Sequence, residues 1–304
     1  MHSFKILSPI RKLVPYAEAA KKAGKTVYHL NIGQPDIATP DAALNAIHQL
    51  DHKVLEYSHS AGFESYRQKL ALSYQKQGIP VLTEDIIITT GGSEALIFGL
   101  MTACNPGDEV IIPEPFYANY IGFAMAAGIK IIPITSTIES GFALPPIESF
   151  KAKITPKTKG IFICNPNNPT GYVYSEEELL QIRDLIKEKD LYLFSDEAYT
   201  EFSYKGKVKS TLSLEGVEDR VIMIDTFSKK YSACGARIGA LVTKNKEVIE
   251  AVMKFSQARL SPPTLEQIAA EAALSLPSDY FDATRQEYAN RRKTLISRLE
   301  KMEG

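Results

Sequence analysis

Two adjacent lysines stand in the segment "DTFSKKYSACGARIGALV" at residues 225–242. Thr226 comes three residues before Lys229, the first lysine of the pair, and Arg237 comes eight residues after it. A lysine amine can form a Schiff base with a carbonyl compound. An arginine can bind a phosphate group through parallel hydrogen bonds. The segment therefore has the groups to hold a phosphorylated carbonyl compound, with Lys229 or Lys230 as the nucleophile.

The elements that must position this segment alternate between strands and helices. From about residue 60 to 275, short apolar runs alternate with amphipathic helical stretches. The runs are "DIIITT", "EVIIPE", "IKIIPIT", "GIFICNP", "LYLFSDE", "RVIMIDT" and "IGALVT". Several are apolar at consecutive positions, which is typical of strands that helices cover on both faces. The pattern predicts an α/β fold with a mostly parallel sheet flanked by helices.

Polar clusters follow four of these runs directly. They are "GGSEAL", "NPNNPTG", "SDEAY" and "TFSKK", and each stands at the C-terminal end of its expected strand. Ligands of open parallel sheets bind in the crevice at that edge. We therefore expect the four clusters to meet in one active site.

The glycine pair in "TTGGSEALIFGLM" lies between an expected strand and an expected helix. Glycines let backbone N–H groups approach an anion, and a helix N-terminus adds positive potential. This predicts a phosphate site at Gly91, Gly92 and Ser93. A plain turn with Ser93 or Thr90 as the helix cap explains the same letters. The sequence has neither a Walker loop nor a G-x-G-x-x-G motif, which disfavours a nucleoside triphosphate or a dinucleotide.

The histidines do not suggest metal or hydrolase chemistry. All five lie in the first sixty residues, none forms a metal-spaced pair, and none falls in the polar clusters. We therefore expect no metal site. The residues that remain are Lys229 or Lys230, Asp196, Tyr199, Asn168 and Arg237. They suit pyridoxal 5'-phosphate, which needs an amine for its aldehyde, a carboxylate for its ring nitrogen and cationic donors for its phosphate.

The chain resembles a class I/II pyridoxal-phosphate-dependent aminotransferase of the aspartate aminotransferase superfamily, fold type I. The motifs that carry the resemblance are "NIGQPD", "YSHSAGFESYR", "GGSEAL", "PEPFYANY", "NPNNPTG", "SDEAY" and "TFSKKYSACGARIG", in the family's order and over nearly the whole chain. The resemblance implies transfer of an amino group from an L-amino acid to a 2-oxo acid by a ping-pong aldimine/ketimine mechanism.

The resemblance assigns roles to the residues of the lysine segment. The lysine after Ser228 is the family's Schiff-base residue, so the resemblance selects Lys229 and leaves Lys230 as a solvated or structural residue. Arg237 and Thr226 would bind the phosphate of the cofactor. Asp196 would pair with the pyridine nitrogen, in preference to its neighbour Glu197.

Further roles follow from the other motifs. Tyr199 and Asn168 would hydrogen-bond the ring oxygen of the cofactor, and Asn168 would also face the substrate. Tyr117 matches an aromatic residue that stacks on the ring. Gly33 matches a position whose N–H meets the substrate carboxylate. Tyr57 matches a tyrosine that reaches the phosphate of the other subunit, which implies a homodimer with shared active sites.

The same scaffold hosts other reactions, so alternatives remain open. A C–S β-lyase or another fold-type-I lyase would use the same cofactor residues. The chain ends where the family continues into a segment with the arginine for the substrate carboxylate. We therefore expect a C-terminally truncated chain, with an incomplete small domain and with a cofactor-binding but inactive form as a further alternative. An effector-sensing module would carry an N-terminal helix-turn-helix domain, for which we see no room.

The expected domains are a large cofactor-binding domain at 46–279 and parts of a small α/β domain at 1–45 and 280–304. The 304 residues are 44% hydrophobic and 23% charged, with a formal net charge of −1, which favours neither nucleic acid nor a membrane as partner. The three cysteines form no CxxC motif and fit a reducing compartment. With no signal-peptide pattern at the start, we expect a cytoplasmic enzyme.

Overall fold

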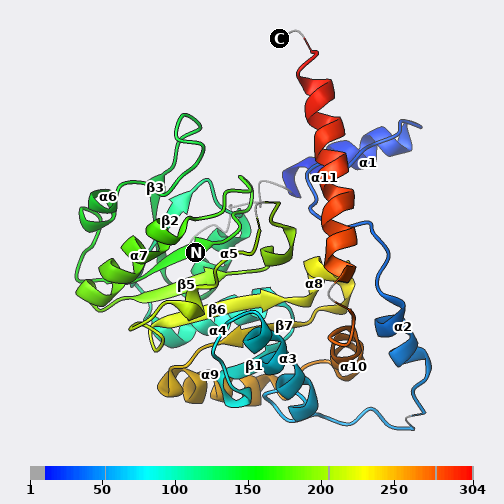
Figure 1. Cartoon of the computed structure of the whole chain (residues 1–304), viewed down its shortest axis with the longest axis horizontal. Helices are drawn as coiled ribbons and strands as arrows, with labels where there is room; N and C mark the ends of the chain where they lie inside the picture. The colour runs from blue at the N-terminus through cyan, green and yellow to red at the C-terminus, as the bar shows by residue number, and fades with distance from the viewer. Residues whose placement is uncertain (1–10, 52, 205, 278, 303–304) are drawn as a thin grey trace.

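A seven-stranded sheet forms the centre of the molecule in the computed structural model, which describes residues 11–51, 53–204, 206–277 and 279–302 (Figure 1). The strand order is β1-β7-β6-β5-β4-β2-β3. The strands are β1 (Ile86–Thr89), β2 (Glu109–Glu114), β3 (Lys130–Thr135), β4 (Thr158–Cys164), β5 (Tyr192–Asp196), β6 (Val221–Thr226) and β7 (Gly239–Val242). Each of the seven apolar runs is a strand, and the predicted α/β fold is confirmed.

All strand pairs are parallel except those of β7, which runs antiparallel to both β1 and β6. Gly239, at the start of β7, is paired with Thr89 at the end of β1 and with Thr226 at the end of β6. The first residue of β7 therefore lies at the same edge of the sheet as the last residues of its neighbours. This edge carries the polar clusters.

Helices cover both faces of the sheet. One face packs against α4 (Gly92–Ala103), α5 (Asn119–Ala126) and α9 (Lys246–Arg259). The other packs against α3 (Glu64–Lys76), α7 (Glu176–Lys189) and α10 (Thr264–Ala273). Along β4, Ile161 and Ile163 point to the second face while Phe162 and Cys164 point to the first.

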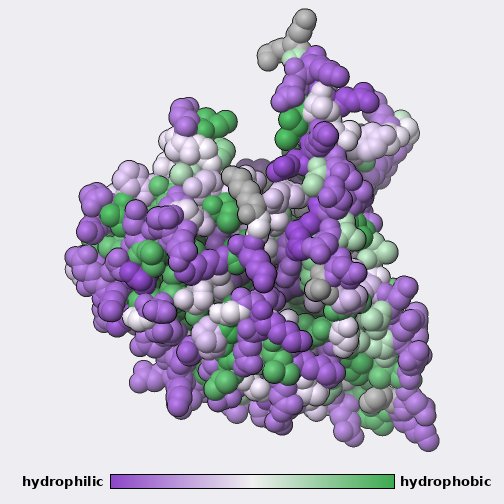
Figure 2. All heavy atoms as spheres, in the orientation of Figure 1, coloured by the Kyte–Doolittle hydropathy of each residue, from purple (hydrophilic) through white to green (hydrophobic). Residues whose placement is uncertain are grey.

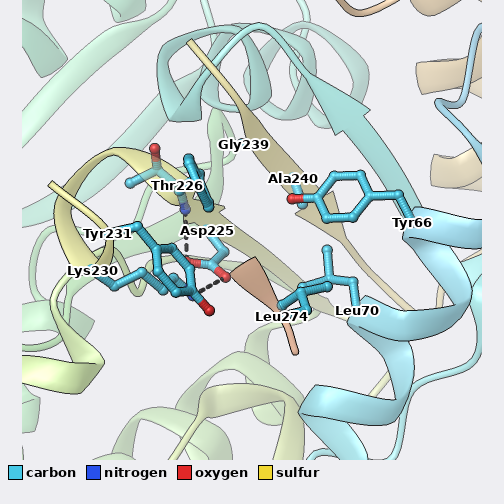
Figure 3. Close-up of a pocket in the computed structure, with 10 residues that line it drawn as sticks. Tyr66, Leu70, Asp225, Thr226, Lys230, Tyr231, Gly239, Ala240 and Leu274 are labelled. Carbon is cyan, nitrogen blue, oxygen red and sulfur yellow. Dashed lines mark hydrogen bonds and ion pairs between the residues drawn. The ribbon is translucent and has the colours of Figure 1, made fainter. Parts of the chain in front are cut away.

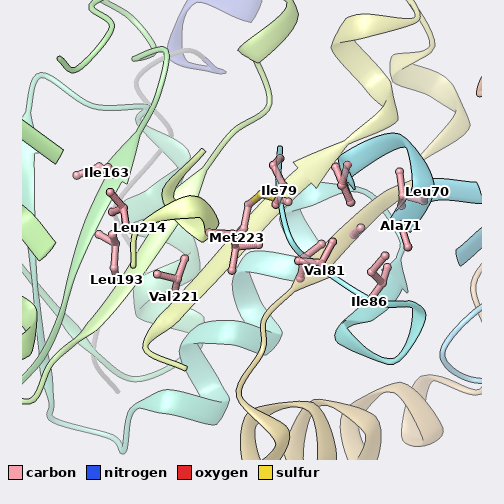
Figure 4. Close-up of a cluster of buried hydrophobic side chains, with 14 of the residues drawn as sticks. Leu70, Ala71, Ile79, Val81, Ile86, Ile163, Leu193, Leu214, Val221 and Met223 are labelled. Atoms are coloured by element: carbon pink, nitrogen blue, oxygen red, sulfur yellow. The ribbon is translucent and has the colours of Figure 1, made fainter. Parts of the chain in front are cut away.

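The two buried layers explain why the strands read as continuous apolar runs. Figure 4 shows the layer between the sheet and α3, where Leu70 and Ala71 of the helix lie near Val81 and Ile86. Burying one leucine, valine or isoleucine side chain in this layer stabilises the folded state by about 1.5–3 kcal/mol. The sheet is therefore a rigid frame for the residues at its polar edge.

The remaining helices flank the sheet or connect its strands. They are α1 (Val14–Lys22), α2 (Asp41–His48), α6 (Ile147–Lys151), α8 (Phe227–Lys230) and α11 (Asp279–Leu299), with single 3-10 turns η1 (Arg11–Leu13), η2 (Thr83–Asp85), η3 (Thr200–Phe202), η4 (Thr211–Ser213) and η5 (Cys234–Ala236). Figure 1 shows α11 rising away from the sheet. In the described part of the chain, no helix has the length and apolar character needed to cross a membrane.

Hydrophilic residues cover most of the face in Figure 2, and hydrophobic residues gather on the side that carries α2. The loop after α2 contributes to the exposed apolar surface, since Val54 is 66% exposed and Leu55 58%.

Candidate active site

The turn between β1 and α4 presents backbone N–H groups at the polar edge. Gly91 precedes the helix with φ 77° and ψ 168°, a conformation that only glycine adopts readily. A side chain on Gly239 would lie 2.6 Å from the backbone of Gly91 and Gly92, so β7 approaches this turn as closely as two glycines allow. The first N–H groups of a helix have no partner within it, and they attract anions. Ser93 lies half-buried in this first turn.

The guanidinium group of Arg237 lies over the same turn. A Cβ atom added to Gly91 would stand 2.3 Å from Nη2 of Arg237. Nη1 donates to the carbonyl oxygen of Cys234 at 3.1 Å and to Oγ of Ser228 at 3.4 Å. The hydroxyl of Thr226 accepts from the N–H of Ser228 at 3.2 Å and thus caps α8. Arginine, hydroxyls and helix N–H groups therefore lie close together, and groups of these kinds can bind an anion.

Lys229 projects from α8 toward the same edge. Its Nζ donates to the carbonyl oxygen of Gly33 at 2.8 Å and lies 3.7 Å from Sγ of Cys234. Gly33 belongs to the N-terminal "NIGQPD" segment, 196 residues earlier in the chain. The fold therefore brings two sequence motifs together at the amine. Lys230 forms a buried ion pair with Asp225 instead. The sequence left a solvated or a structural role open for Lys230, and this ion pair is a structural one.

The carboxylate of Asp196 lies at the end of β5, where it is 9% exposed. Its Oδ2 accepts from the hydroxyl of Tyr120 at 2.7 Å, and its Oδ1 accepts from the N–H of Ala198 at 3.1 Å. Burial raises the pKa of the Asp196 carboxyl, and these two hydrogen bonds offset part of that rise. The ammonium of Lys229 also acts to lower this pKa.

Glu197 faces the opposite side of the sheet from Asp196. Its carboxylate accepts from the hydroxyl of Ser195 at 3.0 Å and from both the N–H and the hydroxyl of Thr211 at 2.9 Å. These bonds hold Glu197 inside the protein, away from the edge that carries Lys229. Asp196 is therefore the carboxylate that the structure offers to a ligand.

Two tyrosines and an asparagine line the space around Asp196. Nδ2 of Asn168 donates to the hydroxyl oxygen of Tyr199 at 3.3 Å. Burial raises the pKa of Tyr199 well above its ordinary value, and the charge of Asp196 adds to this effect. Burial also raises the pKa of Tyr117, on which the charges of Asp196 and Arg237 act in opposite directions. Tyr117 is half-buried, and its hydroxyl accepts a hydrogen bond of 2.6 Å from Nδ2 of Asn119.

This donor set fits pyridoxal phosphate. Gly91 and Arg237 offer groups for a phosphate, and Asp196 offers a buried carboxylate for a basic ring nitrogen. Lys229 supplies the amine that such a cofactor requires. Large side chains are excluded over Gly91, where a Cβ would collide with Arg237.

Tyr57 is the one predicted site residue that the structure places away from this group. Its side chain is 78% exposed, in the loop that follows α2. Sequence reasoning also missed two supporting residues. Tyr120 follows Tyr117 by three residues, and Asp225 precedes Thr226 directly. Such spacing next to a predicted site residue is the signal that could have found them.

The family model described as aminotransferase class I and II matches residues 25–304. The chain is 33% identical over 302 residues to aromatic-amino-acid aminotransferase 2 of Thermococcus litoralis, covering 97% of this chain and 76% of the relative. It is 32% identical over 302 residues to the aspartate aminotransferase of Thermotoga maritima, covering 97% and 78%.

Solved structures give the same likeness. An alanine aminotransferase from Pyrococcus furiosus superposes with a TM-score of 0.92 at 32% identity, covering 99% of this chain and 78% of the other. A Thermus thermophilus aspartate aminotransferase variant superposes with a TM-score of 0.91 at 31% identity, covering 97% and 78%.

Proposed function

This chain belongs to the class I and II aminotransferases and is a pyridoxal-phosphate-dependent transaminase, and on that premise we propose which of its residues carry the reaction. Lys229 is the residue that bonds covalently to the cofactor. Its half-buried amine, between Gly33 and Cys234, is the observation that supports this role best. Once the amine of the substrate has displaced it from the cofactor, the free Lys229 amine would take the proton from Cα of the amino-acid substrate.

The cofactor is held at both ends. Arg237 and the N–H groups of Gly91, Gly92 and Ser93 bind its phosphate, together with the hydroxyl of Thr226. Pyridoxal phosphate, when bound, supplies an electron sink that stabilises negative charge at Cα of the substrate.

Asp196 keeps the ring nitrogen protonated. The ammonium of Lys229 acts to lower the pKa of the Asp196 carboxyl, which favours the charged form that this role needs. Asn168 and Tyr199 donate hydrogen bonds to the ring oxygen, and Tyr117 packs against the ring face. Gly33 and Asn168 face the substrate.

Reductive trapping tests the assignment of Lys229. The purified chain is mixed with pyridoxal phosphate, treated with borohydride and digested for peptide mapping. We expect a visible absorbance band before reduction and a modified peptide that contains Lys229 afterwards. The variant Lys229→Ala is expected to show neither. Modification of Lys230 in place of Lys229 would refute the assignment.

The amino-acid donor is proposed to belong to one of the classes that appear in the names of the relatives. These are aspartate, aromatic amino acids and alanine. Each is mixed with the chain and 2-oxoglutarate, and glutamate is measured. Formation of glutamate identifies the donor, whereas release of ammonia and pyruvate without glutamate would indicate a lyase.

A homodimer with shared active sites is the proposed assembly. The loop after α2 supports it, because Val54, Leu55 and Tyr57 expose 66%, 58% and 78% of their surface. Such an exposed apolar group favours a partner surface. Tyr57 would then reach the phosphate in the other subunit, which explains its distance from the site of its own chain.

Mixing two defective variants tests the shared site. In a dimer of Lys229→Ala with Tyr57→Phe, one of the two sites has both wild-type residues. The mixture is therefore expected to bind pyridoxal phosphate more tightly than either variant alone. No gain on mixing, together with a monomeric mass in light scattering, would argue against shared sites.

The proposed division of the chain is a large domain at 46–279 and small-domain parts at 1–45 and 280–304. The position of α11 away from the sheet supports it (Figure 1), although α2 spans the first boundary and packs against α10. A cytoplasmic location is proposed from the three cysteines, which are all free.

A further inference from the structure

Lys230, the residue after Lys229, is held in the protein interior by an ion pair. Its Nζ donates to Oδ2 of Asp225 at 2.6 Å, and the two side chains are 13% and 7% exposed. Successive residues of a helix are rotated by about 100° around its axis. The direction of Lys230 therefore sets the direction in which Lys229 leaves the helix.

One carboxylate binds both ends of α8. Oδ1 of Asp225 accepts from the N–H of Thr226, the N-cap, at 2.7 Å, and Oδ2 accepts from Lys230, the last residue of the helix. A helix of one turn is far too short to be stable by its own hydrogen bonds. Asp225 thus closes the turn that carries Lys229.

The carboxylate is in turn fixed to the helix layer. The hydroxyl of Tyr74, from α3, donates to Oδ2 of Asp225 at 2.7 Å and is buried. Figure 3 shows Asp225 bonded to Thr226 and Lys230 on one side of a small cavity, with Tyr66 and Leu70 of α3 on the other. The cavity measures about 20 Å³, against about 300–1,000 Å³ for small-molecule sites. The network therefore receives no substrate.

Asp225 favours the charged form of the Lys230 side chain. Burial acts to lower the pKa of the Lys230 ammonium, but the carboxylate of Asp225 outweighs it, so the pKa is raised above the ordinary lysine value of 10.5. A raised pKa of this sign means that the pair stabilises the fold below pH 10.5 and loses its effect as the pH rises through the folded value. Near neutral pH the Lys230 ammonium is therefore charged.

We propose that Asp225 and Lys230 are positioning residues for Lys229, which hold the one-turn helix so that the Lys229 amine faces the cofactor. They touch neither the cofactor nor the substrate. The inference rests on the proposed role of Lys229, because it explains how that amine is oriented. Without the pair, α8 can rotate or unwind, and the amine loses its alignment.

The test measures two quantities separately: the rate at which the Lys229 amine reacts with the cofactor, and the affinity of the site for the cofactor. The 304-residue chain, freed of cofactor, is mixed with pyridoxal phosphate, and the rise of its visible absorbance is followed. In this step the amine nitrogen adds to the aldehyde carbon, one water leaves, and a C=N bond forms. Pyridoxamine phosphate has no aldehyde, so its affinity reports the phosphate and ring contacts alone.

In Lys230→Met we expect attachment to be about 10- to 100-fold slower, because a small misplacement of a reacting group costs this much. The affinity for pyridoxamine phosphate is expected to stay at the wild-type value. Lys230→Arg, which keeps the charge, is expected to restore most of the rate. The double variant Asp225→Asn/Lys230→Met removes both charges, so it is expected to regain stability without regaining the rate.

Glu109→Gln is the matched control for a loss of stability alone. Glu109 is a buried carboxylate at the start of β2, at the opposite end of the sheet, and accepts from the hydroxyl of Thr155 at 2.7 Å. This variant is expected to melt earlier and to react at the wild-type rate.

Several outcomes would overturn the proposal. An unchanged rate in Lys230→Met would do so, as would a rate and a pyridoxamine phosphate affinity that fall together. If Lys230→Met does not fold, a wild-type rate in the double variant would have the same meaning. Failure of the wild-type chain to attach the cofactor would instead refute the role of Lys229 itself.

Discussion

The hydroxyl of Tyr120 donates a hydrogen bond of 2.7 Å to Oδ2 of Asp196, and both side chains are buried. Tyr120 comes from the first turn of α5 and Asp196 from the end of β5, 76 residues apart in sequence. The bond supports a carboxylate whose pKa burial has already raised. The bond therefore stabilises the charged form of Asp196, which burial has separated from water.

Tyr120→Phe removes this donor and keeps the ring. A hydrogen bond to a charged group contributes about 1.5–3 kcal/mol, so we expect a loss of this order in the free energy of unfolding, measured with urea. The pKa of Asp196 is expected to rise further, because the lost bond acts to lower it. Cofactor affinity should then fall off at a higher pH than in the wild type.

Tyr172→Phe is the control for this change. Its hydroxyl also donates to a carboxylate, that of Glu178 at 3.0 Å, but it lies far less deeply in the protein. The loss of stability should be smaller, and the pH dependence of cofactor binding should not change. Equal effects of the two variants on cofactor binding would contradict the role of Tyr120.

Asp196→Asn should stabilise the cofactor-free protein at neutral pH while it weakens cofactor binding. The folded pKa of Asp196 is raised above 3.8, so the folded state binds its proton more tightly than the unfolded state does. Burial of the charged form therefore destabilises the wild type above the folded pKa and has no effect below 3.8.

Melting temperatures of the two proteins, taken from pH 4 to pH 8, measure this difference. The variant should melt higher at pH 8, and the gap should close as the pH approaches 4. A gap that widens toward low pH would show that the carboxylate is stabilised in the fold, contrary to its burial.

The strands and their order along the chain were predictable because helices cover both faces of the sheet. That burial makes each strand an apolar run, and the seven runs are the seven strands. The antiparallel direction of β7 was not predictable in the same way. Its run, "GALV", is apolar like the parallel strands, since direction depends on pairing with β1 and β6 and not on side-chain pattern.

In the candidate site, too, only the residues of one short segment could be predicted from the sequence, whereas contacts between distant elements could not. Lys229, Arg237 and Thr226 stand within one short segment, so their spacing is visible in the sequence. The partners of buried carboxylates come from distant elements. Tyr74 and Asp225, for example, are 151 residues apart and meet only because α3 packs on the sheet. No local pattern encodes that contact.

Gly91→Ala should weaken phosphate binding more than it weakens the fold. The new Cβ would lie 2.3 Å from Nη2 of Arg237, which must move away. Loss of one charge-assisted bond corresponds to roughly a 10- to 100-fold drop in affinity for pyridoxal phosphate. Fluorescence titration of the cofactor-free protein measures it.

Gly78→Ala provides the matched comparison. Gly78 also has a positive φ, of 86°, but no atom lies within 4 Å of an added Cβ. This variant should lose about 1–2 kcal/mol of stability from backbone strain and keep its cofactor affinity. If Gly78→Ala lost as much affinity as Gly91→Ala, strain alone would account for both.

Alkylation of Cys234 should block cofactor attachment. Cys104 and Cys164 are buried, and burial raises the pKa of the Cys104 thiol to about 12, so neither offers an accessible thiolate. Cys234 is partly exposed, with its Sγ 3.7 Å from Nζ of Lys229. N-Ethylmaleimide should therefore modify Cys234 first and place a bulky group beside the amine.

Mass spectrometry counts the adducts, and absorbance after addition of pyridoxal phosphate measures the block. Prior addition of the cofactor should protect the Cys234 thiol, because a cofactor bonded to Lys229 would block access to it. Cys234→Ser should attach the cofactor normally and resist the reagent, whereas Cys104→Ser should remain sensitive. Normal cofactor attachment by a protein fully alkylated at Cys234 would mean that the thiol does not border the cofactor site.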